Sequence, residues 1–519
     1  MNNGKICVSV CAETANEFLE KIEQAAKIAD VVELRFDCLK QTEPEILFKE
    51  LKRIRQNNQS KLLVTFRPKE QGGKRDLSFD ERIYFWRDSH IDEFVDWGDV
   101  ELEIKKHELD GYLNAIYNRV IYSAHDFFNV PADLELIYEK LSLESVNKNT
   151  NKQSNVVKIA AQANDATDGL SLFKLLERAK AEKQELIPIA MGESGVWTRI
   201  LGLSRGAFMT FAAFDEESAT APGQLTAQEM IDVYRVKELD ETSEIYGLVA
   251  ESVAYSVSPQ MHNAAFKFHK MNAVYVPFAV KNLEEFVRRM VNPKTREIDW
   301  NFRGFSTTIP HKIEIMKHLD FVDETARKIG AVNTVKIEGD KLLGFNTDAD
   351  GFIEPLKNAF GDLNGARVAV FGAGGAARAC VYALQRENAN VTVFARNPEK
   401  AKSLVVDFGV EIQDLQSQIE PLKNFDVIVN ATPLGMTKGG LENETAATAE
   451  QLKGVGLIYD LVYNPFETRL MREASSVFAP TIGGLAMLVT QAAAQQKIWT
   501  GKDAPVKEMS TAALGKLQS

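Results

Sequence analysis

The sequence predicts an α/β protein whose first half is a parallel (β/α)8 TIM barrel and whose second half is a further two-domain α/β unit. Three observations predict this architecture. Eight short apolar runs alternate with helix-length polar segments in the first half, a new strand follows the charged segment Val236–Glu244, and a glycine-rich turn follows a later strand at Arg367–Phe371. Apolar strands separated by helices indicate parallel pairing, and eight such units in about 230 residues fit a barrel.

The apolar runs that predict the barrel strands are Ile6–Ala12, Val31–Asp37, Leu62–Arg67, Phe94–Leu102, Val120–Phe127, Val156–Ala161, Leu186–Gly192 and Ala207–Phe214. The polar stretch Glu144–Asn155 predicts a loop before the sixth strand. The segment Val236–Glu244 either links the barrel to the next unit or extends the preceding helix. A strand at Ile245–Ala250 then opens the second unit, and an Ala- and Gln-rich pattern at Leu485–Thr500 predicts a long C-terminal helix.

The composition narrows the class of protein. The chain of 519 residues has 61 Lys and Arg against 73 Asp and Glu, a net charge of −12, so we expect no nucleic-acid partner. We expect neither a signal peptide nor a membrane segment, and hence a cytoplasmic protein. The four cysteines form no CxxC pair, so we expect buried free thiols, no metal site and no disulfide framework. They are Cys7, Cys11, Cys38 and Cys380.

Lys158 is the candidate nucleophile of the barrel. It lies between Val157 and Ile159 in the sixth strand, and barrel active sites form at the C-terminal ends of the strands. A charged lysine is costly to bury there, whereas a desolvated amine can form a Schiff base with a ketone. The alternative is a lysine that snorkels outward from the strand.

Further candidates follow other barrel strands. His125 ends the fifth strand and is either a general base or a structural residue. Arg35, Arg67 and Arg199 would form an anion site for a carboxylate if they converged on the barrel mouth. Otherwise they are structural residues held in salt bridges.

Five motifs of the first half resemble type I 3-dehydroquinate dehydratase, in the order of that family. The motifs are Glu33–Asp37, Thr65–Glu70, Ser123–Phe127, Val157–Ala160 and Ala221–Gln224. The resemblance implies that Lys158 forms the imine and that His125 is the acid/base. It also implies that the substrate pocket contains Glu33, Arg35, Arg67, Arg199, Thr220 and Gln224.

Two positions depart from the family pattern. The family usually has a glutamate four residues after the arginine that matches Arg67, whereas this chain has Gln71 there and Glu70 one residue earlier. The partner of His125 therefore stays open between these two residues. Thr220 stands where serine is usual, a change that keeps the hydroxyl.

A glycine-rich turn opens the last third of the chain. Gly372–Ala377 reads GxGxxA between a strand and a helical run, which is either a variant of the Rossmann dinucleotide fingerprint or an ordinary glycine turn. The next strand, Val391–Phe394, ends at Ala395 and Arg396. An NAD site usually has a carboxylate there for the ribose, whereas Arg396 suits the 2′-phosphate of NADP unless it is a surface arginine.

Several loops upstream are rich in hydroxyl and amide groups, which suit a polyol. They are Ser256–Pro259, Thr308–Lys312, Gly330–Thr334 and Gly344–Asp348. Lys312 and Asp348 would together make a proton-transfer pair beside a hydroxyl. Alternatively, Lys312 is solvated and Asp348 caps the next helix.

These loops resemble shikimate dehydrogenase, and the match continues to residue 505. The later motifs are Asn430–Met436, Tyr459–Pro465 and Met487–Gln491. Shikimate would then be bound by Ser256, Ser258, Thr308, Asn333, Asp348, Tyr463 and Gln491, with Lys312 and Asp348 as the catalytic pair. NADP(H) would be bound by Gly372, Ala373, Gly374, Gly375, Ala376, Ala377, Arg396 and Thr432. Ser306 departs from the asparagine that is common in the family.

The two resemblances together imply a bifunctional enzyme of aromatic amino acid biosynthesis. Residues 1–238 would dehydrate 3-dehydroquinate to 3-dehydroshikimate. Residues 244–347, joined by the helix at 485–505, would bind that product, and a Rossmann domain at 348–484 would supply NADPH to reduce it to shikimate. Two alternatives remain: a non-catalytic sensor, since fungal quinate repressors resemble the same domains, and a quinate/shikimate dehydrogenase that uses NAD. The four catalytic residues argue against the first, and Arg396 argues against the second.

Overall fold

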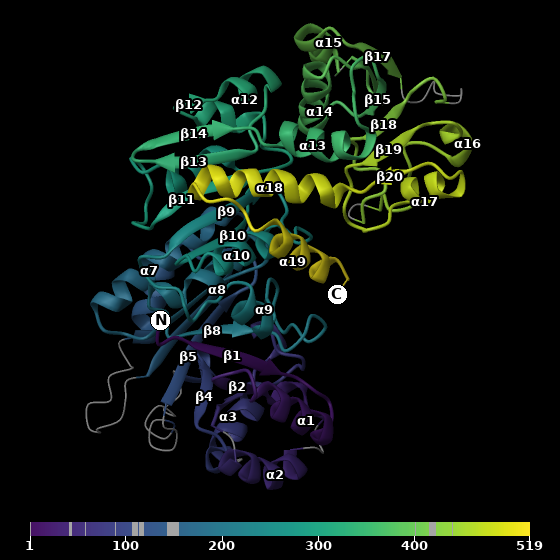
Figure 1. Ribbon diagram of the computed structural model, residues 1–519. Helices are drawn as coiled ribbons and strands as arrows, with labels where there is room; N and C mark the ends of the chain where they lie inside the picture. The colour runs from purple at the N-terminus through teal and green to yellow at the C-terminus, as the bar shows by residue number, and fades with distance from the viewer. Residues whose placement is uncertain are drawn as a thin grey trace. The chain divides into compact units, whose positions relative to one another are not determined.

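The protein forms two compact units, which we describe separately in a computed structural model (Figure 1). The structure describes residues 2–40, 44–57, 59–88, 90–105, 113, 119–142, 155–399, 401–414, 422–437 and 440–518. The loop predicted at Glu144–Asn155 lies outside these residues except for its last member. The first unit comprises Met1–Glu244, Asn272–Val291 and Thr295–Asn301, and the second comprises Ile245–Met271, Asn292–Lys294 and Phe302–Ser519. Within the described ranges, no helix is both long and apolar enough to cross a membrane.

Eight parallel strands form the barrel of the first unit, as the apolar runs predict. They are β1 (Lys5–Val10), β2 (Val31–Arg35), β3 (Lys61–Thr65), β4 (Trp97–Glu101), β5 (Arg119–Asp126), β6 (Val156–Gln162), β7 (Leu186–Met191) and β8 (Met209–Ala212). Their order is β7-β6-β5-β4-β3-β2-β1-β8. The backbone N–H of Phe208, just before β8, donates to the carbonyl of Leu186 in β7 at 2.9 Å, which nearly closes the barrel.

Helices separate the barrel strands. They are α1 (Ala15–Ala25), α2 (Pro44–Asn57), α3 (Phe79–Asp88), α4 (Leu102–Lys105), α6 (Leu134–Ser142), α7 (Gly169–Ala181), α8 (Val196–Leu201) and α9 (Ala227–Asp232). Helix α1 shows why these segments are helical: the Thr14 hydroxyl caps its first turn, and Phe18 and Ile22 bury one face at helical spacing. Helix α9 ends at Asp232, so the segment Val236–Glu244 does not extend it.

The interior of the barrel changes from apolar to polar along the strands. Its amino-terminal layer contains Cys7, Val31, Leu63, Trp97, Ile121, Val156, Ile187 and Met209. The next inward positions, two residues further along six of these strands, carry the buried polar side chains of Ser9, Glu33, Thr65, Asp99, Ser123 and Lys158. Side chains alternate between the two faces of a strand, so residues two positions apart point to the same side. The inward faces that fill the barrel with apolar side chains therefore also carry its polar site.

The second half of the chain contains a mixed sheet followed by a parallel one. The mixed sheet has the order β10-β9-β11-β13-β14-β12. Its strands are β9 (Glu244–Ala250), β10 (Ala273–Ala279), β11 (Phe302–Thr307), β12 (Phe321–Val322), β13 (Thr334–Glu338) and β14 (Lys341–Phe345). The parallel sheet contains β15 (Arg367–Phe371), β16 (Asn390–Ala395), β17 (Glu411–Asp414), β18 (Val427–Asn430), β19 (Leu457–Asp460) and β20 (Thr481–Ile482). Its order, β17-β16-β15-β18-β19-β20, is that of a Rossmann fold.

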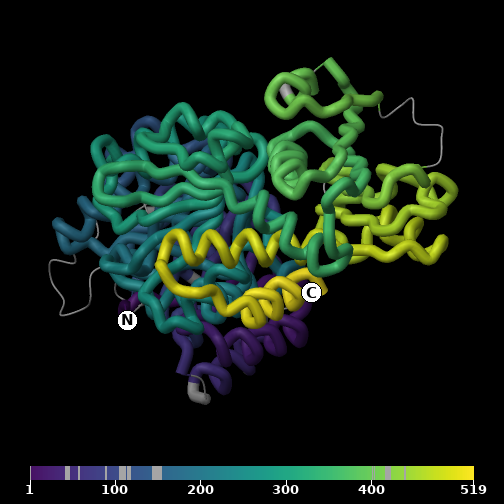
Figure 2. Tube along the Cα trace, turned by 45° about the horizontal axis from the view of Figure 1, so that its top comes forward, coloured from purple at the N-terminus to yellow at the C-terminus, as the bar shows by residue number. Residues whose placement is uncertain are grey.

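The helices of this half are α10 (Ser258–Phe268), α11 (Leu283–Phe286), α12 (Glu324–Ile329), α13 (Asp348–Phe360), α14 (Gly375–Arg386), α15 (Lys402–Phe408), α16 (Ala449–Leu452), α17 (Arg469–Ser476), α18 (Gly484–Thr500) and α19 (Val506–Gln518). Helix α18 confirms the predicted C-terminal helix, and Figure 2 shows it in yellow beside α19. It packs on the mixed sheet, where the Trp499 indole donates to the carbonyl of Val335 at 3.0 Å.

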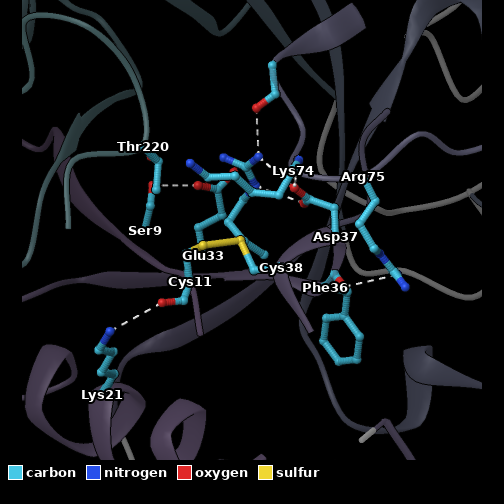
Figure 3. Close-up of a disulfide and its surroundings, with 12 residues drawn as sticks. Ser9, Cys11, Lys21, Glu33, Phe36, Asp37, Cys38, Lys74, Arg75 and Thr220 are labelled. Atoms are coloured by element: carbon cyan, nitrogen blue, oxygen red, sulfur yellow. Dashed lines mark hydrogen bonds and ion pairs between the residues drawn. A yellow bond between two sulfur atoms is a disulfide. The ribbon is translucent and has the colours of Figure 1, made fainter. Parts of the chain in front are cut away.

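The cysteines correct one expectation. Cys7 and Cys380 are buried free thiols, but Cys11 and Cys38 form a disulfide (Figure 3). The prediction of four free thiols is therefore wrong for this pair. Cys11 directly follows β1 and Cys38 ends the short 3-10 helix η1 (Phe36–Cys38) that follows β2. Because β1 and β2 are parallel neighbours, their carboxyl ends bring together residues that are 27 positions apart, which no local spacing motif reveals.

Candidate active sites

One pocket opens at the carboxyl ends of the barrel strands. It is lined by Ser9, Glu33, Arg35, Arg67, Gln71, Gly72, His125, Phe127, Lys158, Ala160, Ile189, Met191, Arg199, Phe211, Thr220, Ala221 and Gln224. All eight barrel residues that the sequence nominates for the site are among them. The barrel therefore brings these residues together from strands and loops that are far apart in the sequence.

Lys158 points into the barrel and does not snorkel outward. Its Nζ lies 2.8 Å from Oδ2 of Asp99 and 3.9 Å from the ring centroid of Phe211. Asp99 is buried and also accepts hydrogen bonds from Arg67 Nη2 and Ser123 Oγ, each at 2.6 Å. Burial alone would raise the pKa of Asp99, but the charges of Arg67 and Lys158 outweigh burial and hold this pKa well below its ordinary value.

His125 is a neutral, half-buried imidazole. Its Nε2 lies 2.7 Å from Arg67 Nη1, and because a guanidinium only donates, Nε2 accepts and the proton resides on Nδ1. Burial and the neighbouring charge of Arg67 lower the pKa of His125 well below its usual value. The ring is therefore unprotonated at neutral pH and can accept a proton from a substrate.

Neither residue considered as the partner of His125 bonds to it. Glu70 is exposed on the 3-10 helix η2 (Lys69–Gln71), whereas Gln71 lines the pocket. In the described part of the chain, Nδ1 of His125 is buried without a hydrogen-bond partner. The contact that orients the ring in this structure comes from Arg67.

The arginines of the pocket differ in how they are neutralised. Arg35 forms two hydrogen bonds to Asp37, at 2.9 and 2.8 Å, and Arg67 pairs with Asp99. Arg199 is buried and bonds only to the carbonyls of Phe211 and Pro222, with no acidic partner among the described residues. Burial lowers the pKa of Arg199 to about 10, so it remains a cation at neutral pH. This uncompensated guanidinium is suited to a carboxylate ligand.

The remaining residues of the pocket supply hydroxyl, amide and carboxylate groups. Glu33 accepts hydrogen bonds from Ser9 Oγ at 2.5 Å and Thr65 Oγ1 at 2.7 Å. Oε1 of Gln224 accepts from the backbone N–H of Thr220 at 2.7 Å and from its hydroxyl at 3.3 Å. These contacts fix polar groups around the opening, where a polyhydroxylated ring could bind.

A second pocket lies in the second unit and contains another lysine–aspartate pair. It is lined by Leu248, Ser256, Ser258, Ser306, Thr307, Thr308, Lys312, Asn333, Asp348, Ala376, Leu461, Tyr463, Gly484, Met487, Leu488, Gln491 and Gln495. All the residues that the sequence nominates for shikimate binding and for its catalytic pair line this pocket.

Lys312 and Asp348 are in contact, with Nζ 2.6 Å from Oδ2. Asp348 begins α13 but does not cap it, because the residue before it, Thr347, holds the cap position. Asn333 Nδ2 donates to Oδ1 of Asp348 at 2.9 Å and to Oε1 of Gln491 at 3.3 Å. Helix α18 thus delivers Gln491 to the pocket, as the sequence predicts.

Hydroxyl groups surround this pair. Ser256 Oγ accepts from the backbone N–H of Ser258 at 3.2 Å. Burial raises the pKa of Tyr463, and a hydrogen bond to Ser256 partly opposes that rise. Thr308 is half-buried at the end of the strand that precedes Lys312. The pocket therefore offers mostly neutral donors and acceptors with one ion pair among them.

The glycine-rich turn between β15 and α14 fits a dinucleotide. Gly372 has φ of +115°, and a Cβ there would lie 2.8 Å from the carbonyl oxygen of Ala431. Nothing lies within 4 Å of a Cβ placed on Gly374, which leaves open space before the first turn of α14. A helix N-terminus with such an approach can hold a pyrophosphate. At Gly375 a Cβ would lie 3.3 Å from Lys312 Cδ, so the turn reaches the catalytic pair.

Two further nominated residues flank this turn. Arg396 is exposed directly after β16, at the same edge of the sheet as Gly372, whose N–H donates to the carbonyl of Phe394 at 2.8 Å. Thr432 follows β18, and its hydroxyl donates to Oδ1 of Asn430 at 2.6 Å. Ala373, Ala376 and Ala377 complete the turn and the start of α14. These residues fit NADP(H) better than NAD because the position after β16 carries a cation instead of a carboxylate.

Sequence reasoning missed Asp99, which contacts both Lys158 and Arg67. The available signal was an aspartate in the middle of a barrel strand, Trp97-Gly98-Asp99-Val100-Glu101, at the inward positions of the strand. Glu101 of the same strand was also missed, and burial raises its pKa to about 7. Over the described ranges, no group of three or more His, Cys, Asp or Glu side chains could hold a metal ion.

Protein-family models match both halves of the chain. Residues 6–241 match the Type I 3-dehydroquinase family. Residues 248–335 match the shikimate dehydrogenase substrate binding domain, and residues 354–461 match the shikimate/quinate 5-dehydrogenase family. Residues 484–514 match the C-terminal domain of shikimate 5′-dehydrogenase.

Individual relatives cover the whole chain or its second half. The chain is 33% identical to a chloroplastic bifunctional 3-dehydroquinate dehydratase/shikimate dehydrogenase from Arabidopsis thaliana, over 97% of this chain and 83% of the relative. It is 40% identical to a shikimate dehydrogenase (NADP+) of Methanocaldococcus jannaschii, over 54% of this chain and 99% of the relative. A crystal structure of a shikimate dehydrogenase in complex with NADP+ superposes with a TM-score of 0.50 at 38% identity, covering 54% of this chain and 98% of that one.

Proposed function

We propose roles for the individual side chains on the premise that this chain belongs to the family of bifunctional 3-dehydroquinate dehydratase/shikimate dehydrogenases. The chain catalyses two consecutive steps of the shikimate pathway. The barrel dehydrates 3-dehydroquinate to 3-dehydroshikimate, and the second half reduces that ketone to shikimate with NADPH. The residue roles below are our own assignments.

In the dehydratase, Lys158 attacks the ketone carbon of 3-dehydroquinate and forms an imine with loss of water. Asp99 faces Nζ before the reaction and holds the lysine in the barrel. The iminium acidifies the neighbouring carbon. His125, neutral because of burial and the charge of Arg67, takes a proton from that carbon and returns it to the departing hydroxyl. Hydrolysis of the product imine then releases 3-dehydroshikimate and restores the amine.

The substrate carboxylate is assigned to Arg199. Arg35 and Arg67 already have buried carboxylate partners in Asp37 and Asp99, whereas Arg199 has no acidic partner among the described residues. A buried guanidinium gains most from a bidentate carboxylate because it has lost the solvation of water. Binding there would orient the ring toward Lys158, which lines the same pocket.

In the reductase, NADPH bound at the glycine-rich turn would supply the hydride that reduces the carbonyl carbon of 3-dehydroshikimate. Lys312 donates a proton to the oxygen that becomes the new hydroxyl, and Asp348 orients Lys312 through the 2.6 Å contact. Asn333 holds Asp348 and is itself bonded to Gln491. Asn333 and Gln491 bind ring hydroxyls, together with Ser256, Ser258, Thr308 and Tyr463. Arg396 would hold the 2′-phosphate of NADPH, and the turn from Gly372 to Ala377, with Thr432, would hold its pyrophosphate.

The observation that carries this proposal is the convergence of Lys158, His125 and an unneutralised Arg199 on one buried pocket. The test supplies purified protein with 3-dehydroquinate and NADPH and follows the formation of the conjugated enone and the consumption of NADPH by absorbance. When 3-dehydroquinate is the only substrate supplied, NADPH should be consumed without a second enzyme, because the barrel produces the 3-dehydroshikimate that the second half reduces. Borohydride with 3-dehydroquinate should add covalent mass at Lys158, whereas label at another residue or no label would overturn the imine assignment.

A further inference from the structure

None of the residue roles proposed above uses the disulfide between Cys11 and Cys38, which lies at the carboxyl ends of two neighbouring barrel strands (Figure 3). Cys11 is the first residue after β1, and Cys38 ends η1 directly after β2. Their Cα atoms are 5.5 Å apart. The bond therefore ties the loop after β1 to the loop after β2, at the end of the barrel that carries the pocket.

The four cysteines differ in how accessible they are to reagents. Cys11 and Cys38 are both partly exposed, whereas Cys7 and Cys380 are buried. Burial also raises the pKa of the Cys7 and Cys380 thiols well above the ordinary value. Thiol–disulfide exchange requires both access and a thiolate. Exchange should therefore be confined to the pair at the barrel mouth.

Hydrogen bonds connect this pair to the substrate pocket. Asp37 directly precedes Cys38, is buried, and holds Arg35 by bonds of 2.9 and 2.8 Å. Its Oδ2 also accepts from the backbone N–H of Lys74 at 3.0 Å. Arg35 lines the pocket and donates to the carbonyl of Gly72 at 2.9 Å. A shift of η1 relative to β1 would therefore move Asp37, and with it the guanidinium of Arg35.

We propose that Cys11 and Cys38 form a reversible redox modification site that tunes substrate binding by the dehydratase. The oxidant is a low-molecular-weight disulfide and the reductant is the corresponding thiol, two molecules of which are consumed when the Cys11–Cys38 bond is reduced. In oxidation, the sulfur–sulfur bond of the reagent breaks and the Cys11–Cys38 bond forms. The protein loses two electrons and the protons of its two thiols, and these yield two molecules of reagent thiol. The bonded state holds η1, Asp37 and Arg35 in place, and reduction loosens them.

This inference rests on the proposed function of the barrel, so the test measures sulfur chemistry and catalysis separately. The full-length protein is equilibrated in buffers of glutathione and glutathione disulfide over a range of ratios. Alkylation in denaturant followed by peptide mass spectrometry then reports the state of each cysteine. The KM and kcat for 3-dehydroquinate are measured on the same samples, and reduction of 3-dehydroshikimate by NADPH in the same samples is the internal control.

We expect Cys11 and Cys38 to change state together, while Cys7 and Cys380 stay reduced. Reduction should raise the KM for 3-dehydroquinate by up to about tenfold, because loosening Arg35 displaces a pocket-lining guanidinium that can donate a hydrogen bond to the substrate ring, with a smaller change in kcat. The reductase should not change. Cys11→Ser and Cys38→Ser should each have the higher KM in every buffer, whereas the control Cys380→Ser should respond like the wild type.

Two results would overturn the inference. Alkylation of Cys11 and Cys38 at every ratio of glutathione disulfide to glutathione would show that both thiols stay free and that the bond does not form. Equal KM values in the oxidised and reduced wild type would show that the bond has no effect on the pocket, and this comparison needs no variant. A protein that forms the bond but dehydrates nothing in either state contradicts the proposed function itself, and the regulatory inference fails with it.

Discussion

The two active sites of this chain use the same pair of residue types in different surroundings. Lys158 and Asp99 lie 2.8 Å apart in the barrel, with side chains 5% and 0% exposed. Lys312 and Asp348 lie 2.6 Å apart in the second unit, with side chains 14% and 6% exposed. The first lysine is on β6 and its partner is on β4, two strands away in the same sheet. The second lysine is on a loop and its partner begins a helix.

The two lysine–aspartate distances are similar, but the hydrogen-bond networks around the two aspartates differ. Asp99 is shared by Lys158, Arg67 and Ser123, so its carboxylate is surrounded by cationic and hydroxyl donors. Asp348 is held by a neutral amide from Asn333 in addition to Lys312. A lysine that forms an imine needs a position shielded from water. Its carboxylate partner must also be held by other residues when Nζ moves to the substrate. A lysine that only passes a proton needs a mobile end and access to solvent.

The largest expected effect separates the two lysines. Lys158→Ala should lower the dehydratase rate by roughly 10⁴-fold or more, because it removes the covalent route entirely. Reduction of 3-dehydroshikimate should be unchanged, since the two pockets share no residues. Lys312→Ala should produce the opposite pattern, with a loss of roughly 10²–10⁴-fold in reduction only. Steady-state rates with each substrate measure both.

The control for this pair of variants is Lys52→Ala, which changes an exposed lysine on α2. It should leave both rates as they are. Loss of both activities in either active-site variant would contradict the assignment of one lysine to each reaction. Circular dichroism of each variant would then distinguish misfolding from true coupling of the sites.

The next effect tests which group moves protons in the barrel. His125→Ala should slow dehydration by roughly 10²–10⁴-fold, because the iminium loses its positioned base. Borohydride should still trap 3-dehydroquinate on Lys158 of this variant, since Nζ is hydrogen-bonded to Asp99 and the imidazole to Arg67. A near-normal dehydratase rate would remove His125 from the mechanism. Comparison of Gln71→Ala with Glu70→Ala would show whether the pocket-lining amide contributes, and we expect an effect only from Gln71.

Much of the fold could be predicted because hydrophobic patterning decides it. The eight apolar runs became the eight barrel strands, and the GxGxxA turn lies between β15 and α14. The barrel runs were predicted one to three residues too long at several ends. Phe94–Leu102, for example, contains the strand β4 only at Trp97–Glu101, because Phe94–Asp96 form the turn that follows the 3-10 helix at Ile91–Glu93. Local patterns define where apolar residues recur, but hydrogen bonds define where a strand begins.

The parts of the sites that were missed depend on contacts between strands. Asp99 was hidden because its importance comes from Lys158 and Arg67 on other strands, not from any local motif. The Cys11–Cys38 bond was missed for the same reason, since it joins the ends of two parallel neighbours. The choice between Glu70 and Gln71 could not be made from spacing, because η2 turns one side chain to solvent and the other to the pocket.

Burial of carboxyl groups in the barrel predicts a dependence of stability on pH. Burial raises the pKa of Glu101 to about 7, above the value of about 4.3 in an unfolded chain. Between these values the unfolded chain ionises while the folded chain stays protonated, so the contribution of Glu101 to stability is lost as the pH rises toward 7. Glu101→Gln cannot ionise and should be more stable than the wild type at about pH 8 by up to about 3 kcal/mol, with little difference near pH 4.

Urea unfolding followed by tryptophan fluorescence at both pH values measures this difference. Glu103→Gln is the matched control, because Glu103 lies two residues further along and is exposed. It should change the stability equally little at both pH values. Equal free energies of unfolding for Glu101→Gln and the wild type at about pH 8 would contradict this prediction. They would mean that the folded barrel stabilises the ionised form of Glu101 and that its pKa is not raised.

The smallest expected effect concerns the second unit alone and the choice of cofactor. Arg396 is exposed after β16, where the neighbouring Ala395 offers no carboxylate to bind a ribose or repel a phosphate. Charge-assisted bonds from its guanidinium to the 2′-phosphate should favour NADPH over NADH by on the order of 10- to 100-fold for each bond. Arg396→Ala should therefore raise the KM for NADPH, change the KM for NADH little, and leave kcat and the dehydratase untouched. Because an exposed charge is screened, the preference of the wild type should also fall as salt is added. If the wild type used NADH as efficiently as NADPH, the hypothesis that Arg396 binds the 2′-phosphate would be wrong, and the site after β16 would bind a cofactor that lacks this phosphate.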